Sequence, residues 1–339
     1  IQAKTAAGLA LAQAQLGGWL SGELRRVREA LLGRLAYFTA LVDFPEDEIE
    51  PQDVAGPLAE AQRDLERLLA TADQGIVYRQ GARAALVGLP NAGKSSLLNA
   101  LLRADRAIVT PIPGTTRDTL EETANLYGIP VVLVDTAGIA ETDDPVERLG
   151  VARSRAALAA ADLALLVIDA SAPLADADAA IAALADGKPT ILVLNKIDLV
   201  RQASGRVGEW ASGCAGEVMS PRRPLAPSPH PPLKPAAVVA TSALTGAGLD
   251  DLARAVADLL LGGAAQAGAR MITSPRHRDA LARAAGHLRD ALDAHARGVP
   301  ADLLAVDLTV ALSAIGEVTG DGVGDDLLAA IFSRFCIGK

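Results

Sequence analysis

The sequence contains too few cysteines for a disulfide-stabilised fold. The 339 residues include two cysteines, Cys214 and Cys336. So few cysteines predict that the protein works in a reducing compartment. Long apolar runs are also missing, because the most apolar stretch, from Leu163 to Ile168, is far shorter than the roughly 20 residues that cross a bilayer. No secretion signal opens the chain. These absences argue against a secreted disulfide scaffold and a transmembrane protein, and predict a cytoplasmic protein with no membrane partner.

An excess of basic residues is absent as well. The 32 Lys and Arg residues stand against 41 Asp and Glu residues, so the net charge is −9 at pH 7. This balance excludes a protein that coats nucleic acid by bulk charge, but leaves a local basic site open. The four histidines have no cysteine or carboxylate partner at zinc spacing, so we expect them on the solvated surface.

Both ends of the chain have helical patterns. From residue 1 to about 81, apolar residues recur at spacings of three, four and seven, and the segment Asp43-Phe-Pro-Glu-Asp-Glu48 interrupts them. A second helix is predicted to end near Gly75. Residues 265–339 are helical again, with candidate spans at 276–297, 301–318 and 325–332. Since neither arm buries its apolar face alone, we expect them to pack together as one discontinuous helical domain.

Between these arms, residues 82–264 alternate short apolar runs with amphipathic stretches. This pattern is typical of a mostly parallel sheet with flanking helices. The predicted strands are Ala84–Val87, 119–127, Val131–Asp135, Leu163–Asp169, Thr190–Leu194 and Val238–Thr241. Residues 201–236 are rich in Pro, Gly, Ser and Arg, and we expect an irregular loop there. The predicted fold is an α/β domain inserted into a discontinuous all-α domain.

The strongest chemical signal is the glycine-rich loop Gly88-Leu-Pro-Asn-Ala-Gly-Lys-Ser95. It lies between a predicted strand and a helix that begins near Lys94, so its backbone N–H groups and the helix N-terminus suit phosphates. Lys94 is predicted to reach the β- and γ-phosphates, and the Ser95 hydroxyl to ligate Mg²⁺. The nucleotide-binding residues predicted here are Asn91, Ala92, Gly93, Lys94, Ser95 and Ser96.

Three further elements follow in the order that a P-loop GTPase requires. Asp135-Thr-Ala-Gly138 ends a strand, where the carboxylate can hold Mg²⁺ through water and the glycine can meet the γ-phosphate. Asn195-Lys-Ile-Asp198 ends another, and the Asp198 carboxylate suits the N1–H and amino group of guanine. Ser242-Ala-Leu244 ends the last strand, where a backbone N–H can meet guanine O6. Together they predict GTP and GDP binding through Asp135, Thr136, Ala137, Gly138, Asn195, Lys196, Asp198, Ser242, Ala243 and Leu244.

The segment 107–118, between the phosphate loop and Asp135, contains the pair Thr115-Thr116. Its position predicts a switch that closes over the γ-phosphate and Mg²⁺. Together with Gly114-Thr-Thr-Arg-Asp118, the phosphate loop and the Asp-Thr-Ala-Gly element without a following Gln resemble the TrmE/Era-like family of bacterial GTPases.

The helical arms and the ending Phe335-Cys-Ile-Gly-Lys339 narrow this resemblance to the MnmE (TrmE) family, which modifies the wobble uridine of certain tRNAs. The resemblance covers the chain except 201–236. It implies that an amino-terminal folate-binding domain, which carries much of the family's dimerisation, would precede residue 1.

The resemblance implies a set of metal ligands. Ser95 and Thr116 would ligate Mg²⁺, and a K⁺ ion would supply the charge that an arginine finger gives elsewhere. The implied K⁺ ligands are the Asn91 side chain, the carbonyls of Thr110 and Ile112, and Thr115. The alternative for Asn91 is a backbone hydrogen bond within the phosphate loop, and Arg117 stays a candidate finger.

The resemblance also implies roles in catalysis and in the tail. It makes Glu147 the carboxylate that polarises water, beside Lys94 and Thr116; without the family, Glu147 is an acidic residue in the first turn of a helix. The terminal Lys339 would touch 5-formyltetrahydrofolate, which the family binds mostly through its amino-terminal domain. Cys336 would either serve the modification centre or pack as a small hydrophobic residue.

The function implied is K⁺-activated GTP hydrolysis that opens and closes paired G domains of a homodimer. With the flavoprotein partner MnmG (GidA), it would drive carboxymethylaminomethyl-type modification of the tRNA wobble uridine. An alternative is an Era-like ribosome-assembly GTPase, although residues 265–339 carry 8 basic and 9 acidic side chains and fit a basic RNA-binding domain poorly. A dynamin-like membrane remodeller would need a basic amphipathic or hydrophobic insertion, and we find none in the sequence.

Overall fold

The computed structural model describes residues 3–44, 46, 49–104, 122–136, 155–173, 176–185, 187–200, 235–263 and 270–334. The chain divides into two compact units. The helical unit comprises Leu9–Ile76 and Ala267–Lys339, together with Ile1, and the sheet unit comprises Gln2–Gly8 and Val77–Gln266.

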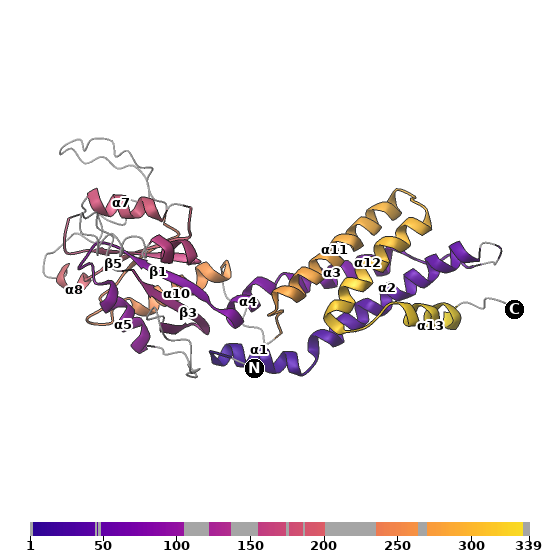
Figure 1. The fold of residues 1–339 in the computed structure, drawn as a ribbon, viewed down its shortest axis with the longest axis horizontal. Helices are drawn as coiled ribbons and strands as arrows, with labels where there is room; N and C mark the ends of the chain where they lie inside the picture. The colour runs from indigo at the N-terminus through magenta and orange to yellow at the C-terminus, as the bar shows by residue number, and fades with distance from the viewer. Residues whose placement is uncertain are drawn as a thin grey trace. The chain divides into compact units, whose positions relative to one another are not determined.

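The helical unit brings together helices from both ends of the chain. Helices α2 (Trp19–Asp43) and α3 (Ala55–Leu69) come from the first arm, and α11 (Pro275–Ala296), α12 (Ala301–Thr319) and α13 (Gly324–Arg334) come from the second. The strongest packing joins α11 to α12, α12 to α2 and α11 to α3 (Figure 1). Proline at the first position of α11 suits the helix start, where the missing N–H has no intrahelical partner anyway.

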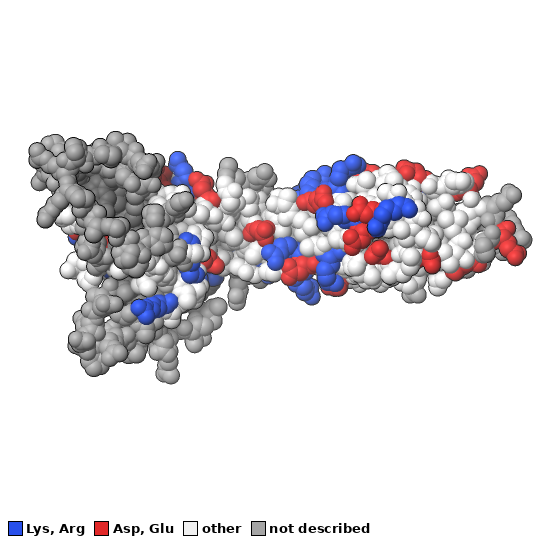
Figure 2. All heavy atoms as spheres, turned by 90° about the horizontal axis from the view of Figure 1, so that it is seen from above, with Lys and Arg blue, Asp and Glu red and all other residues white. Residues whose placement is uncertain are grey.

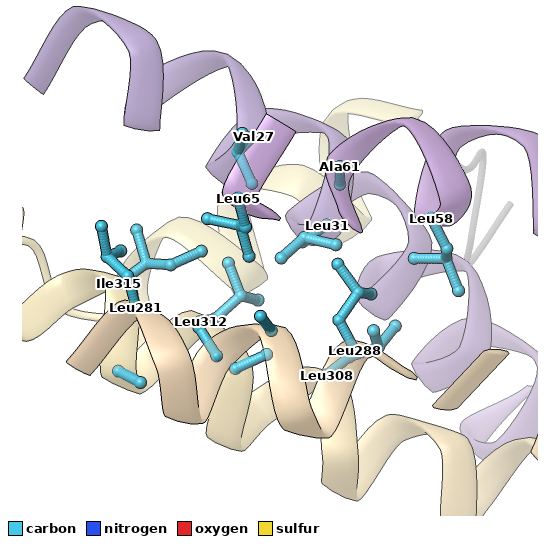
Figure 3. Packing of buried hydrophobic residues seen from close by; sticks show 14 of the residues in the cluster. Val27, Leu31, Leu58, Ala61, Leu65, Leu281, Leu288, Leu308, Leu312 and Ile315 are labelled. Atoms are coloured by element: carbon cyan, nitrogen blue, oxygen red, sulfur yellow. The ribbon is translucent and has the colours of Figure 1, made fainter. Parts of the chain in front are cut away.

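One hydrophobic core is shared by the two arms. The apolar residues recur at helical spacing along each helix, so each helix turns one continuous stripe inward. Figure 3 shows side chains from the first arm lying against side chains from the second, among them Leu31, Leu58, Leu65, Leu281, Leu288, Leu308, Leu312 and Ile315. The arms therefore form one discontinuous helical body, as their amphipathic pattern predicts.

Helix α13 is attached to α2 by an ion pair as well as by apolar contacts. Arg28 on α2 is only 8% exposed, and its guanidinium donates to Asp326 at 2.5 Å and to the Gly322 carbonyl. Ala36 packs against Ile331 nearby. A buried guanidinium needs such partners, because an unpaired buried charge is strongly destabilising.

Replacing a core leucine of α12 should destabilise the helical unit far more than replacing an exposed one. Leu308 has 0% exposure and Leu303 is 56% exposed on the same helix. We expect Leu308→Ala to lower the free energy of unfolding by about 2–5 kcal/mol, and Leu303→Ala to change it by less than about 0.5 kcal/mol. Denaturant unfolding followed by circular dichroism measures both. Equal losses would contradict the assignment of α12 to the shared core.

The sheet unit contains a six-stranded sheet in the order β2-β3-β1-β4-β5-β6. Strand β2 is antiparallel to β3, and all other neighbours are parallel. The strands are β1 (Ala82–Val87), β2 (Glu122–Leu126), β3 (Ile129–Asp135), β4 (Leu163–Asp169), β5 (Thr190–Asn195) and β6 (Ala237–Ala240). Since the carboxyl ends of parallel strands meet at one edge, the residues that follow β1, β3, β4, β5 and β6 converge there.

Helices cover both faces of this sheet. Leu158, from helical residues 155–160, and Ile181, from α7 (Asp176–Leu184), cover one face and pack on alternate residues of β1, β4 and β5. Helices α5 (Lys94–Ala104) and α10 (Leu249–Leu261) pack against the sheet and each other. The short helix α8 (Ile197–Val200) follows β5. Strands buried on both faces explain the continuous apolar runs in the sequence.

The predicted fold class is confirmed, and the differences are local. Helices α1 (Ala6–Leu16) and α4 (Ala72–Gln80) both cross the division between the units. Gln2–Gly8 belongs to the sheet unit, not to the helical arm predicted for 1–81, because Thr5 Oγ1 donates to the Gly128 carbonyl at 2.7 Å. The second division falls after Gln266, where the sequence predicts 264.

Two glycines mark differences in the first arm, and the limits of β1, β2, β3, β5 and β6 differ from the predicted ones by one to three residues. The break after α1 lies at Gly18, whose φ of 73° suits glycine. The predicted helix end near Gly75 is wrong, because α3 ends at Leu69 and a separate helix, α4, runs from Ala72 to Gln80. At Gly75 a Cβ atom would lie 2.3 Å from the Ile272 carbonyl oxygen, so this glycine serves close packing. The predicted loop at 201–236 lies almost entirely outside the described residues.

Candidate functional site

The phosphate loop connects β1 to α5 and requires glycine at two positions. A Cβ atom on Gly88 would lie 2.2 Å from the Val167 carbonyl oxygen, and one on Gly93 would lie 2.3 Å from Asn195 Nδ2. Gly93 also has a φ of 93°, which disfavours side chains with a Cβ. The loop therefore approaches β4 and the residue that ends β5 as closely as backbone allows.

The Lys94 side chain folds back into this loop. It is 6% exposed, and its Nζ donates to the Gly88 carbonyl at 3.0 Å and to the Leu89 carbonyl at 2.8 Å. Burial lowers the pKa of Lys94, and the negative charge of Asp135 opposes that shift. The ammonium is thus held among the main-chain groups that follow β1, where the sequence predicts phosphate binding.

Ser95 and Asp135 form the candidate Mg²⁺ position. The Ser95 hydroxyl donates to Asp135 Oδ2 at 2.5 Å. Asp135 Oδ1 is buried and has no hydrogen-bond partner among the described residues, and a buried carboxylate oxygen without a partner is costly unless a cation or water reaches it. Serine hydroxyl and carboxylate oxygens are ligands that Mg²⁺ accepts. The residues present therefore fit this ion.

Thr136 fixes the start of the next predicted motif. Its side chain is 2% exposed and donates to the Leu86 carbonyl, and its backbone N–H donates to the same oxygen at 3.3 Å. These two hydrogen bonds tie the end of β3 to β1 beside the phosphate loop.

Ser96, one residue after the predicted Mg²⁺ ligand, is exposed.

On the other side of the site, Asn195 connects three loops. It is 1% exposed, its Nδ2 donates to the Ala92 carbonyl at 3.0 Å, and its Oδ1 accepts the Ala243 backbone N–H at 3.2 Å and the Thr241 hydroxyl at 3.4 Å. Asp198 Oδ1 accepts the Ser242 hydroxyl at 2.5 Å. The side chain of Leu244, the last predicted nucleotide-binding residue of this motif, is 85% exposed to solvent. The guanine motifs, far apart in sequence, are therefore joined to each other and to the phosphate loop.

Two residues that the motifs do not include also belong to this network. Thr241, with 0% exposure, donates to Asn195, and Asp169 at the end of β4 pairs with Lys196 at 2.6 Å. Burial disfavours the charge of Asp169, but hydrogen bonds from Lys196 and Ser171 outweigh it and lower the pKa of this carboxyl. The rule that parallel strands end at one edge is the signal that would have found Asp169.

Asn91 occupies the left-handed region with a φ of 64° and is exposed. The remaining predicted site residues lie outside the described part of the chain. These are Thr110, Ile112, Thr115, Thr116, Ala137, Gly138, Glu147 and Lys339, and with them the alternatives Arg117 and Cys336. Their roles stay predictions.

The described histidines His277, His287 and His295 are half-buried and not on the solvated surface as expected. His287 on α11 is half-buried, and its Nδ1 lies 3.0 Å from Asp307 Oδ1 on α12. With Asp290 it forms a group of three potential metal-ligand residues whose donor atoms lie within 4.8 Å of one another. The carboxylate partner comes from the following helix, so spacing within one motif does not reveal it.

The surface charges of the helical unit are mixed. Figure 2 shows Lys and Arg side chains beside Asp and Glu side chains on this unit, with no extended patch of one sign on the face drawn. Ion pairs of Arg283 with Glu317 at 2.6 Å and of Arg289 with Glu66 at 3.2 Å are examples. Among the helices that the structure describes, none is long and apolar enough to traverse a bilayer.

Comparison with a family model and comparison with known proteins give the same family. The family model described as the MnmE helical domain matches residues 1–336. Proteins named tRNA modification GTPase MnmE from Roseiflexus sp. (strain RS-1) and from Chloroflexus aurantiacus are 62% and 57% identical, and each match covers 100% of this chain and 71% of the relative.

Among solved structures, an Era variant from Aquifex aeolicus bound to GDP·AlF₄⁻ is similar with a TM-score of 0.41. It is 28% identical, and the match covers 61% of this chain and 66% of that chain.

Proposed function

We propose that this chain, which belongs to the MnmE family of tRNA modification GTPases, hydrolyses GTP to drive modification of the wobble uridine in tRNA. The observation that carries the nucleotide assignment is the Asn195 network. It joins the phosphate loop at Ala92 to the loop at Ala243, while Ser242 orients Asp198. The same sheet edge thus offers groups for phosphates and for a guanine base.

The described residues of the site have distinct roles in this proposal. Lys94 would leave the two carbonyls that it contacts now and bind the β- and γ-phosphates. Ser95 and Asp135 would hold Mg²⁺, which neutralises charge that develops on the phosphate oxygens during transfer. Asp198 would accept the N1–H and amino group of guanine, a donor pair that adenine lacks. Gly93 keeps the loop backbone close to Asn195.

The residues that would activate GTP hydrolysis are those that the family resemblance implies. Asn91, Thr110, Ile112 and Thr115 would ligate K⁺, Thr116 would complete the Mg²⁺ ligands, and Glu147 would polarise the attacking water. The position of Asn91 in the phosphate loop supports the first of these roles, because a cation held there supplies positive charge next to the phosphates.

The proposed partners are tRNA, the flavoprotein MnmG and a second copy of the chain. Paired G domains would close with K⁺ and GTP and open after hydrolysis, and this movement would gate the modification reaction. Lys339 would contact the family's 5-formyltetrahydrofolate. The proposed location is the cytoplasm. The Era-like alternative is less well supported, because the family match extends through both helical arms.

Complementation tests the whole proposal. Bacterial cells that lack their own MnmE-family gene should regain the modified wobble nucleoside when they express the gene for this protein, and nucleoside mass spectrometry of their tRNA measures it. A Lys94→Ala variant is the control and should restore nothing, because the phosphates lose their lysine. Unchanged tRNA together with altered maturation of ribosomal RNA would favour the Era-like alternative.

A further inference from the structure

We infer that Asp169 is a positioning residue for the guanine nucleotide and acts through Lys196 to slow release of the bound nucleotide. This inference rests on the proposed function, because it assumes that Lys196 lies beside the bound nucleoside. Asp169 lies outside the four sequence motifs and has no other assigned role.

The Asp169 carboxylate is itself held firmly at the end of β4. Its Oδ1 accepts the Ser171 backbone N–H at 2.9 Å and the Ser171 hydroxyl at 2.6 Å, and its Oδ2 accepts the Lys196 ammonium at 2.6 Å. Both oxygens are therefore occupied. A carboxylate fixed from one side by the following turn imposes a defined position on the ammonium that it contacts from the other.

The Lys196 side chain lies between this carboxylate and the phosphate loop. Its backbone has a φ of 64°, an uncommon conformation for a residue with a Cβ. Its Cε lies 3.8 Å from where a Cβ on Gly93 would stand, so the stem runs along the loop. Neighbouring Asn195 and Asp198 belong to the guanine motif. The lysine stem is thereby presented at the proposed nucleoside position with its charge already paired.

Pairing in advance matters because a free lysine side chain loses much rotamer freedom when a ligand orders it. Asp169 imposes that order before the nucleotide arrives, and such preorganisation strengthens binding. The opposite effect is also physically possible, since a carboxylate near phosphates repels them. The sign of the change on removing the Asp169 charge therefore separates a positioning role from simple repulsion.

Dissociation of a fluorescent GDP analogue, chased with excess GDP, measures the effect. We expect Asp169→Asn to release the nucleotide about fivefold faster, the scale of one partly exposed ion pair. Asp169→Glu, which keeps the charge, should recover part of the loss. The matched control is Asp162→Asn, directly before β4, where the carboxylate accepts the Arg83 backbone N–H at 2.7 Å; it should stay within twofold of the wild-type rate.

A double-mutant cycle with Lys196→Met distinguishes positioning from a general loss of structure. If Asp169 acts through Lys196, Asp169→Asn should have little further effect in the Lys196→Met background. Additive effects, a wild-type rate in Asp169→Asn, or slower release would each overturn the inference.

Should Asp169→Asn fail to fold, Ser171→Ala supplies the same test. This variant removes one hydrogen bond to the carboxylate and should accelerate release by a smaller factor, and an unchanged rate would count against the inference. If the wild type itself binds no guanine nucleotide, the proposed function fails, which is a different result from a variant that behaves like the wild type.

Discussion

Replacing Asp198 by Asn should convert a guanine site into a xanthine site. We expect affinity for GDP to fall by about 10²–10⁴-fold, because two charge-assisted hydrogen bonds are lost and each is worth about 1.5–3 kcal/mol. Affinity for xanthosine diphosphate should rise, since an amide can donate to the second carbonyl of xanthine. The phosphate-binding groups Lys94 and Ser95 are unchanged in this variant.

The structure explains why the amide would take the useful orientation. Asp198 Oδ1 accepts the Ser242 hydroxyl at 2.5 Å, and in the variant the amide oxygen is the only atom of the group that can keep this bond. The amide nitrogen is then directed away from Ser242. Removing the serine hydroxyl should therefore weaken the change of base preference. The Ser242→Ala, Asp198→Asn double variant should discriminate less well between guanine and xanthine.

Competition binding with both nucleotides measures the exchange of preference. Asp250→Asn is a suitable control, because this exposed carboxylate on α10 contacts Tyr127 and Arg254 and no described residue of the nucleotide motifs. It should leave both affinities unchanged. If Asp198→Asn bound GDP as tightly as the wild type, Asp198 would not be the residue that reads the base.

The fold was predictable where burial alone determines the sequence pattern. The run Leu163–Asp169 is predicted and observed with the same limits, because a central parallel strand is buried on both faces and must be apolar throughout. The second arm was equally predictable: helix α12 is observed at Ala301–Thr319 where the pattern predicts 301–318. Periodicity could not locate the break at Gly18 or the packing role of Gly75, because both depend on backbone geometry and on a distant neighbour.

The site was predictable only in part, and the reason is again distance along the chain. Short motifs identify Lys94, Ser95 and Asp198, because each motif keeps its chemistry within a few residues. Asp169 and Lys196 are 27 residues apart and meet only because β4 and β5 are parallel neighbours in register. The pairing of His287 with Asp307 likewise follows from the packing of two helices.

Removing the Asn91 side chain should abolish the difference in GTP hydrolysis rate between K⁺ and Na⁺ buffers. In the proposed site, the amide oxygen helps to hold a monovalent cation against the phosphates, and that cation replaces an arginine finger, which is worth about 10³–10⁵ in rate. Nucleotide binding should remain nearly intact in Asn91→Ala, since Lys94, Ser95 and Asp198 are retained. We therefore expect a large loss in kcat with K⁺ and little change with Na⁺.

The backbone at this position requires a second variant. Asn91 has a φ of 64°, and alanine in that conformation is strained by roughly 1–2 kcal/mol, so Asn91→Ala alone would confuse lost ligation with a distorted phosphate loop. Glycine removes the same side chain without that strain. If the side-chain oxygen is the ligand, Asn91→Gly and Asn91→Ala should lose the K⁺ effect equally, with hydrolysis rates measured in both salts at matched ionic strength. Full K⁺ stimulation in Asn91→Gly would show that the loop conformation, and not the amide, is what matters. Equal wild-type rates in K⁺ and Na⁺ would remove the cation from the mechanism and leave Arg117 as the better candidate.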